Sequence, residues 1–211
     1  MKYTHIVWDF NGTLLDDVQT GIDCVNRLLA VRGLPVILNK DYYRSVFGFP
    51  IREYYTRLGF DFNKEDYHTL AVEWVSLYNR ECRKAPLVPG AAEALEHFRC
   101  AGVRQILLSA TEREMLRRQL ASLKLAGYFD EVLGLDNIHA GSKTHLGTLW
   151  TERIKPKRAL VIGDTVHDYE TAQAMGADCV LYAGGHMARS VLLRCDCPVI
   201  DDLSQVFEIV S

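Results

Sequence analysis

The sequence of 211 residues has no run of about 18 apolar residues and no long block of charges of one sign. A membrane-spanning helix needs about 20 consecutive apolar residues, so none is expected. The formal net charge is −3, and basic residues are interspersed with acidic ones. No polybasic surface that would attract nucleic acid or anionic lipid is therefore expected. We expect neither a nucleic-acid nor a membrane partner.

The sequence also lacks a CxxC motif and any Cys/His spacing typical of a zinc site. Its six cysteines include Cys195 and Cys197, which are separated by one residue, too close for an ordinary structural disulfide. Reduced thiols in a reducing compartment are the simplest interpretation. The apolar stretch near the start is too short for the core of a signal peptide. We therefore expect a cytoplasmic protein.

Helical periodicity runs from Asp16 to about Ala85. Apolar residues recur at helical spacing from Val18 to Leu29, and Gly33 is a stop signal. Further helix starts are expected at Asn39, Pro50 and Asn63. No strand pattern interrupts this block, which we interpret as all-helical.

The texture changes from Val88 onward, where short apolar runs alternate with helical segments. This alternation is typical of βαβ units in a parallel sheet. Thr111, with Glu114 three residues later, predicts a capping box at the start of one helix. We predict a doubly wound α/β core formed by residues 1–15 and 86–211, with a helical cap domain of residues 16–85 inserted after the first strand. The runs predicted to form strands are HIVWDF, VRQILLSA, DEVLGL, RALVIGD, DCVLYAG and PVID.

Polar residues follow several of these strands. In an open parallel sheet, ligands bind in the crevice at the carboxyl ends of the strands. Three carboxylates, hydroxyl groups and one ammonium group are expected to meet there, from Asp9, Ser109, Thr111, Lys143, Asp164 and Asp168.

Clustered carboxylates repel each other unless a cation lies among them. A few oxygen ligands, with room for water and phosphate, suit Mg²⁺. A phosphate monoester is the natural substrate of such a site, because the cation and Lys143 would offset its charge. Ser109 and the turn amides of residues 10–13 would bind its oxygens, and Asp9 is the best-placed nucleophile for an aspartyl-phosphate mechanism.

The segments DFNGTL and VIGDTVHD, with Ser109 and Lys143 between them in sequence, resemble the four motifs of the haloacid dehalogenase superfamily. The helical insert after the first strand resembles that of its phosphoglycolate-phosphatase-like branch. This resemblance implies that Asp9 is the nucleophile and a magnesium ligand, and that Asn11 gives its backbone carbonyl to the metal. It further implies that Asp164 is the second carboxylate ligand, that Asp168 supports the coordination shell, and that Ser109 and Lys143 hold the transferring phosphoryl group.

The expected substrate is a small phosphorylated metabolite, either phosphoglycolate-like or a sugar phosphate. Its candidate contacts are Gly12 and Thr13 in the first turn, Ala110 beside Ser109, and Arg52 in the helical insert, after a Gly-x-Pro turn. Other branches of the superfamily fit less well: the dehalogenases need no metal, and the phosphonate-cleaving members need a cap lysine where Arg52 stands, whose guanidinium forms no Schiff base. His186, after two glycines, is expected on the surface of a turn.

Asn11 departs from the motif, because phosphatases of this superfamily have an Asp there that protonates the leaving oxygen. An amide exchanges no proton near neutral pH, and positioned acid/base catalysis is typically worth about 10² to 10⁴ in rate. Esters with good leaving groups, such as acyl or aryl phosphates, should suffer less. Three alternatives stay open: an active enzyme with another proton carrier, such as His167 or Tyr43; a weakly active phosphate-binding or regulatory protein; or an Asn that deamidates or was introduced deliberately.

Overall fold

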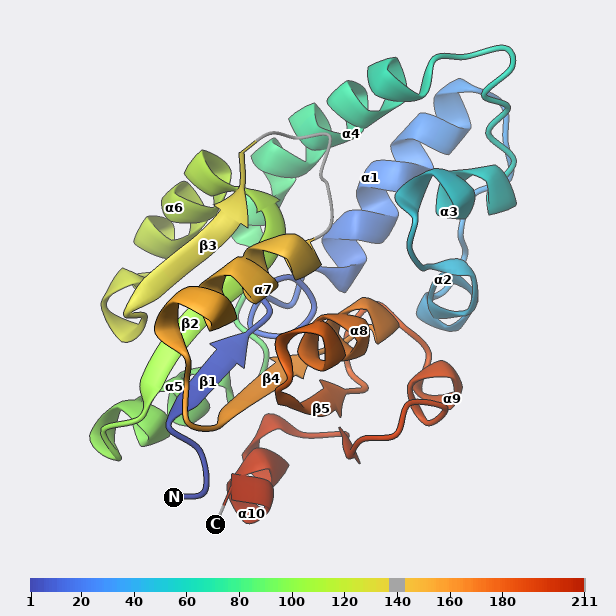
Figure 1. Ribbon diagram of the computed structural model, residues 1–211. Helices are drawn as coiled ribbons and strands as arrows, with labels where there is room; N and C mark the ends of the chain where they lie inside the picture. The colour runs from blue at the N-terminus through green and yellow to red at the C-terminus, as the bar shows by residue number, and fades with distance from the viewer. Residues whose placement is uncertain (137–142, 211) are drawn as a thin grey trace.

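Six parallel strands form one sheet in the computed structural model, which describes residues 1–136 and 143–210 (Figure 1). The strand order is β3-β2-β1-β4-β5-β6. This arrangement confirms the predicted α/β class with a doubly wound parallel sheet. The strands are β1 (His5–Trp8), β2 (Arg104–Glu112), β3 (Glu131–Leu135), β4 (Ala159–Gly163), β5 (Asp178–Tyr182) and β6 (Val199–Ile200).

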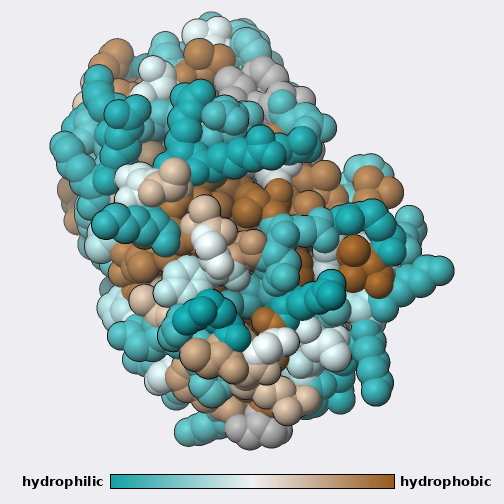
Figure 2. Space-filling view, turned by 90° about the vertical axis from the view of Figure 1, so that its left-hand side faces the viewer, coloured by the Kyte–Doolittle hydropathy of each residue, from teal (hydrophilic) through white to brown (hydrophobic). Residues whose placement is uncertain are grey.

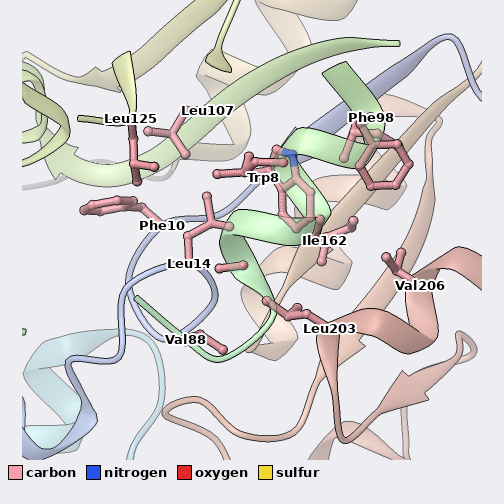
Figure 3. Packing of buried hydrophobic residues seen from close by; sticks show 14 of the residues in the cluster. Trp8, Phe10, Leu14, Val88, Phe98, Leu107, Leu125, Ile162, Leu203 and Val206 are labelled. Carbon is pink, nitrogen blue, oxygen red and sulfur yellow. The ribbon is translucent and has the colours of Figure 1, made fainter. Parts of the chain in front are cut away.

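Both faces of the sheet are buried, as β1 illustrates. Ile6 and Trp8 belong to one hydrophobic cluster, whereas Val7, between them, belongs to another on the opposite face. Successive side chains of a strand point to opposite faces, so a strand covered on both sides reads as a continuous apolar run. Figure 3 shows the first cluster, in which Trp8 lies near Phe98 and Ile162.

Helices cover each face of this sheet. Residues of α5 (Ala91–Cys100), α6 (Arg113–Ser122) and α10 (Val206–Val210) belong to the cluster of Trp8. Residues of three others belong to the cluster of Val7, and two of them, α7 and α8, lie in front of the strands in Figure 1. These three are α7 (Lys143–Ile154), α8 (Val166–Met175) and α9 (Arg189–Leu192).

A helical block lies between β1 and α5 in the sequence and contributes no strand to the sheet. It has a hydrophobic cluster of its own, centred on fully buried residues such as Leu29 and Leu70. In Figure 1 these helices lie together at the upper right, beyond the arrowhead of β1. Its helices are α1 (Val18–Val31), α2 (Lys40–Val46), α3 (Ile51–Arg57) and α4 (Tyr67–Glu81), followed by the 3₁₀ turn η1 (Cys82–Lys84).

Two of the expected helix caps are wrong. Asn39 does cap α2, since its side chain accepts from the backbone amide of Tyr42 at 2.8 Å. The cap of α4 is Asp66, three residues beyond Asn63, because its carboxylate accepts from the backbone amide of Thr69 at 2.9 Å. A carboxylate at a helix start is also favoured by the helix dipole.

The second error concerns Thr111, which does not cap α6. Strand β2 continues through Glu112, and the carboxylate of Glu112 accepts from the backbone amides of Glu114 and Met115. The hydroxyl of Thr111 donates instead to the side-chain oxygen of Asn11 at 2.8 Å. Thr111 therefore belongs to the site described below and not to the start of the helix.

Hydrophilic and hydrophobic side chains are mixed on the face drawn in Figure 2, with hydrophobic ones gathered across its middle. Within the described residues, no helix is long and apolar enough to cross a membrane. All six cysteines are free thiols, as the sequence predicts.

Candidate functional site

Four charged residues meet at the carboxyl edge of the sheet. Asp9 directly follows β1 and Asp164 directly follows β4. These two strands are adjacent, and the order of the sheet reverses between them. Such a reversal is the place at which an open α/β sheet leaves a crevice for a ligand. Lys143 opens α7 and Asp168 lies in the first turn of α8, close in sequence to Asp164, so three distant segments contribute to one site.

Lys143 lies between two carboxylates. Its ammonium group donates to Oδ1 of Asp9 and, at 2.5 Å, to Oδ1 of Asp168, and all three side chains are buried. Burial alone would lower the pKa of Lys143, but Asp168 and Asp9 raise it above its usual value. The lysine is therefore held as a cation. For Asp168, burial acts to raise the pKa, and Lys143 together with hydrogen bonds from Thr165 lowers it.

The remaining negative charge is not balanced by Lys143. One carboxylate oxygen from each of Asp9, Asp164 and Asp168 lies within 4.8 Å of the others. Burial, with repulsion from its carboxylate neighbours, raises the pKa of Asp9 to about 8 despite Lys143. Burial also raises the pKa of Asp164 to about 6, although the charge of His186 opposes the rise. Three buried oxygen donors with such unfavourable ionisation fit a divalent cation.

Asp168 is fixed by the start of its own helix. Its Oδ2 accepts from the backbone amide of Thr165 at 3.0 Å and from the Thr165 hydroxyl at 2.7 Å. It also accepts from the backbone amide of Asp164 at 3.2 Å. Thr165 and Asp168 form the capping box of α8. The spacing in GDTVHD thus serves both the helix and the site, because one oxygen of Asp168 caps while the other faces Lys143.

The turn after β1 approaches Asp164 very closely. Gly12 has φ of +77°, and a Cβ atom placed on it would lie 2.3 Å from Oδ2 of Asp164. Only glycine fits here, on both backbone and steric grounds. Thr13 is buried, and its hydroxyl lies 3.2 Å from Oδ2 of Asp9 and 3.3 Å from Oδ1 of Asp164.

The side chain of Asn11 makes three hydrogen bonds, which use both of its N–H donors and its oxygen. Its Nδ2 donates to Oδ2 of Asp17 at 3.0 Å and to the hydroxyl of Tyr78 at 2.6 Å. Its Oδ1 accepts from the hydroxyl of Thr111 at 2.8 Å. Tyr78 belongs to α4, so this bond joins the helical block to the turn after β1.

Asp17 and His186 form a buried pair that the sequence analysis missed. His186 Nε2 lies 3.1 Å from Oδ1 of Asp17, and Nδ1 lies 2.7 Å from the hydroxyl of Tyr43. Burial lowers the pKa of His186, but Asp17 and nearby carboxylates outweigh it and raise the value to about 9. Burial likewise acts to raise the pKa of Asp17, yet His186, Tyr78 and Asn11 lower it.

The expectation that His186 lies on the surface of a turn is therefore wrong. The residue is only 8% exposed, and its backbone amide donates to Oδ2 of Asp164 at 2.6 Å. The position of His186 in the sequence could have indicated that it lies near the site, because Gly184, Gly185 and His186 follow β5, the strand next to β4. A Cβ atom on Gly185 would lie 2.1 Å from Oδ2 of Asp164, so that turn also packs directly on the carboxylate.

The other residues singled out from the sequence are distributed over the same cavity. Ser109 is buried, and its hydroxyl accepts from the backbone amide of Thr111 at 3.1 Å. Ala110 is half-buried and lines the cavity. Arg52 also lines it but is exposed, with its guanidinium 5.4 Å from the centre of the Phe62 ring.

The cavity has a volume of about 750 Å³ and extends from Asp9 to the helical block. Of the described residues that line it, the only lysine and arginine are Lys143 and Arg52. Both alternative proton carriers considered from the sequence line the cavity as well. These are the buried Tyr43, bonded to His186, and His167, whose ring lies 4.8 Å from that of Phe49.

Comparisons with known proteins agree with this geometry. Residues 6–182 match the family model described as haloacid dehalogenase-like hydrolase. The chain is 25% identical over 194 residues to the phosphoglycolate phosphatase of Aquifex aeolicus, covering 86% of this chain and 85% of that protein. It is 29% identical over 206 residues to the phosphoglycolate phosphatase of Nitrosospira multiformis, covering 90% and 88%. A haloacid dehalogenase-like family hydrolase from Streptococcus pneumoniae superposes with a TM-score of 0.85 at 19% identity over 100% of this chain and 99% of that one, which shows a shared fold.

Proposed function

Because the chain belongs to the haloacid dehalogenase-like hydrolase family, we propose that it is a magnesium-dependent phosphatase that acts on a phosphate monoester through an aspartyl phosphate at Asp9. The observation that carries this proposal is the convergence of Asp9, Lys143, Asp164 and Asp168 at the reversal point of the sheet. A residue set of this kind binds a phosphoryl group by charge and presents a carboxylate to its phosphorus.

Mg²⁺ would be held by the carboxylates of Asp9 and Asp164 and by the backbone carbonyl of Asn11, with Asp168 in support. The raised pKa values of Asp9 and Asp164 favour this assignment, because a dication would relieve the repulsion that raises them. When bound, the ion supplies charge stabilisation to the phosphoryl oxygens.

The chain's own residues would orient the reaction. The Thr13 hydroxyl beside Asp9 holds the attacking carboxylate in place. Lys143 and the hydroxyl of Ser109 would bind the transferring phosphoryl oxygens, with the amides of the turn around Gly12 and Thr13. Lys143 reaches both Asp9 and Asp168, so its charge lies where the negative charge of the phosphoryl group would enter.

We propose that residues 16–85 act as a cap over this site. Their separate hydrophobic cluster and their contribution to the cavity support this role. Closure of such a cap would exclude water from the reacting centre. The compounds to test first are phosphoglycolate, because two relatives are phosphoglycolate phosphatases, and sugar phosphates. Arg52 and Ala110 are the candidate contacts for the rest of the substrate.

A second candidate is a phosphate-binding or regulatory protein on the same scaffold with little turnover. Asn11 favours it, because an amide exchanges no proton near neutral pH and both N–H groups of this one are already donated. The two candidates share the binding site and differ in whether Asp9 becomes phosphorylated.

The deciding experiment measures turnover of p-nitrophenyl phosphate with and without Mg²⁺, together with binding of beryllofluoride, which mimics a phosphoryl group on an aspartate. We expect magnesium-dependent turnover that is lost in Asp9→Asn and retained in Asp196→Asn, a matched change at an exposed aspartate. Beryllofluoride binding without turnover would favour the binding protein. Absence of both would rule out phosphoryl chemistry at Asp9.

A further inference from the structure

Asn11 occupies the position from which the superfamily's acid protonates the leaving oxygen. The groups around it are hydrogen-bonded to one another. The Tyr78 hydroxyl donates to Oδ2 of Asp17 at 2.5 Å and accepts from Asn11. Oδ1 of Asp17 accepts from the backbone amide of Gly12 at 2.8 Å and faces His186. These hydrogen bonds fix the position of the Asn11 amide but supply no acid beside it to protonate a leaving oxygen. The leaving group that suits this site is one that departs without a proton.

The cavity beyond Asn11 is lined by an aromatic wall, which we define as Phe47, Phe49, Tyr54, Trp74 and Tyr78. The ring of Phe47 lies 5.2 Å from that of Tyr54 in an edge-to-face arrangement and 6.0 Å from that of Phe49. Trp74 stacks on Tyr78 with ring centres 4.7 Å apart and planes 11° apart. Flat apolar surfaces of this kind bind planar rings by stacking or edge contacts.

Tyr78 connects the two observations. Its hydroxyl touches Asn11 and its ring stacks on Trp74, so the aromatic wall begins beside the residue that faces the leaving oxygen. The side chains of the aromatic wall carry no charge to pair with a substrate carboxylate, and Arg52, which also lines the cavity, lies over Phe62. The volume of about 750 Å³ also leaves far more room than a two-carbon acid needs.

We propose that the preferred substrates are aryl phosphates, in which the phosphate is esterified to a phenolic oxygen and the ring lies against the aromatic wall. This inference rests on the proposed phosphatase function and specifies its substrate class. A phenol ionises near pH 10, as tyrosine does, whereas an aliphatic alcohol ionises only several pH units higher. A phenolate is thus a leaving group that Asn11 does not hinder.

The first step forms a bond between a carboxylate oxygen of Asp9 and phosphorus while the bond from phosphorus to the aryl oxygen breaks. The bonding electron pair leaves with the phenolate, which takes a proton from solvent. Water then attacks phosphorus, and the bond to Asp9 breaks with return of its electron pair to the carboxylate. One proton of that water stays on the phosphate product and the other passes to solvent, which restores the balance.

The test compares phenyl phosphate with benzyl phosphate, which carries the same ring on an alkoxide leaving group, and with acetyl phosphate, which is small and has a good leaving group. For the unmodified chain with Mg²⁺ we expect kcat/KM for phenyl phosphate to exceed that for benzyl phosphate by about 10²-fold or more. Because phenyl esters are intrinsically more reactive, Asn11→Asp serves as the internal reference. It should reduce that ratio at least about tenfold by raising benzyl phosphate turnover.

The aromatic wall is tested with Trp74→Leu, which keeps an apolar helix former but removes the flat ring. It should raise KM for phenyl phosphate about threefold to tenfold, and the rise in KM for acetyl phosphate, which has no ring, should be smaller. The matched control is Tyr42→Leu, because Tyr42 is 48% exposed on α2 of the same helical block and is absent from the described lining of the cavity. It should change neither value.

The outcomes separate the two proposals. No turnover of acetyl phosphate or any aryl phosphate would refute the phosphatase itself. Turnover of acetyl phosphate with equal use of phenyl and benzyl phosphates, unchanged in Asn11→Asp, would refute the leaving-group argument and show that another acid operates. An equal effect of Trp74→Leu on all three substrates would refute the ring-binding role of the aromatic wall.

Discussion

The side-chain nitrogen of Asn11 lies 3.0 Å from a carboxylate oxygen of Asp17, so an amide and a carboxylate are paired at the position where the resemblance to the superfamily implies a catalytic acid. This hydrogen bond requires a donor at residue 11, which the amide of Asn11 supplies. A carboxyl group at residue 11 would lie against Asp17 and would have to retain a proton, because two adjacent carboxylates do not both ionise readily.

Asn11→Asp should consequently create a working general acid. We expect its pKa to be raised by the neighbouring Asp17 and turnover of alkyl phosphates to rise by about 10² to 10⁴. Steady-state assays over a range of pH check this, and Asn63→Asp makes the same substitution at an exposed asparagine as a control. If the rate does not change, another residue already supplies the proton.

A second prediction concerns the order of the two chemical steps. Formation of the aspartyl phosphate from p-nitrophenyl phosphate needs no acid, but Asn11 supplies no base to activate water for its hydrolysis. We expect a rapid burst of nitrophenolate approaching one equivalent per chain, followed by slow turnover. Rapid-quench kinetics and intact mass after acid quenching would detect the phosphorylated chain, which Asp9→Asn should not form. A linear time course with no phosphorylated chain would contradict this order.

A third prediction uses two glycines with similar backbone angles. Gly12 and Gly102 have φ of +77° and +69°, but a Cβ atom on Gly102 meets nothing within 4 Å. Gly102→Ala should therefore cost only the backbone term of about 1–2 kcal/mol. Gly12→Ala should cost about 1–3 kcal/mol more, because its Cβ would overlap Asp164. Chemical denaturation measures both values. Equal losses would mean that the turn shifts freely away from Asp164.

The fourth prediction is a pH dependence of stability that arises far from the site. His5 packs edge-on against Trp150, with ring centres 5.5 Å apart, and burial followed by the charge of Arg104 lowers its pKa below the usual 6.5. As pH falls below 6.5 the unfolded chain binds a proton on His5 before the folded chain does, so the free energy of unfolding decreases. This contribution is fully present above pH 6.5 and is lost as pH falls through the folded pKa.

His5→Gln should accordingly reduce the loss of stability between about pH 7 and pH 5. The measurement is the free energy of unfolding of both chains across that interval. Parallel curves would show that His5 does not contribute to the acid sensitivity.

The sequence predicted the parts of the site that lie directly at strand ends. Asp9 and Asp164 follow apolar runs whose carboxyl ends must meet in a parallel sheet, so topology alone brings them together. The start of α7 at Lys143 was likewise apparent from local pattern.

The groups around Asn11 were not predictable in this way. Tyr78 lies on the apolar face of an amphipathic helix, which predicts only that its ring is buried. Its hydroxyl lies beside Asp17 because α4 packs against α1. His186 follows two glycines, a pattern typical of an exposed turn, and its burial depends on the neighbouring Asp164. The N-caps of α4 and α6 were predicted wrongly for a simpler reason. In each case two candidate residues lie within one turn, and small differences in the backbone path decide which of them caps the helix. The pairs are Asn63 and Asp66 for α4, and Thr111 and Glu112 for α6.

The hydrogen bonds at residue 11 also bear on how the protein ages. An Asn-Gly pair rearranges when the glycine amide nitrogen attacks the asparagine side-chain carbonyl and closes a succinimide ring. In this turn the amide of Gly12 is already donated to the backbone oxygen of Leu15 at 2.9 Å and to Asp17 at 2.8 Å. The carbonyl of the Asn11 side chain is held by Thr111. Ring closure must first free the glycine amide from its two acceptors, so we expect conversion of residue 11 to be slower in the folded chain than in the unfolded one.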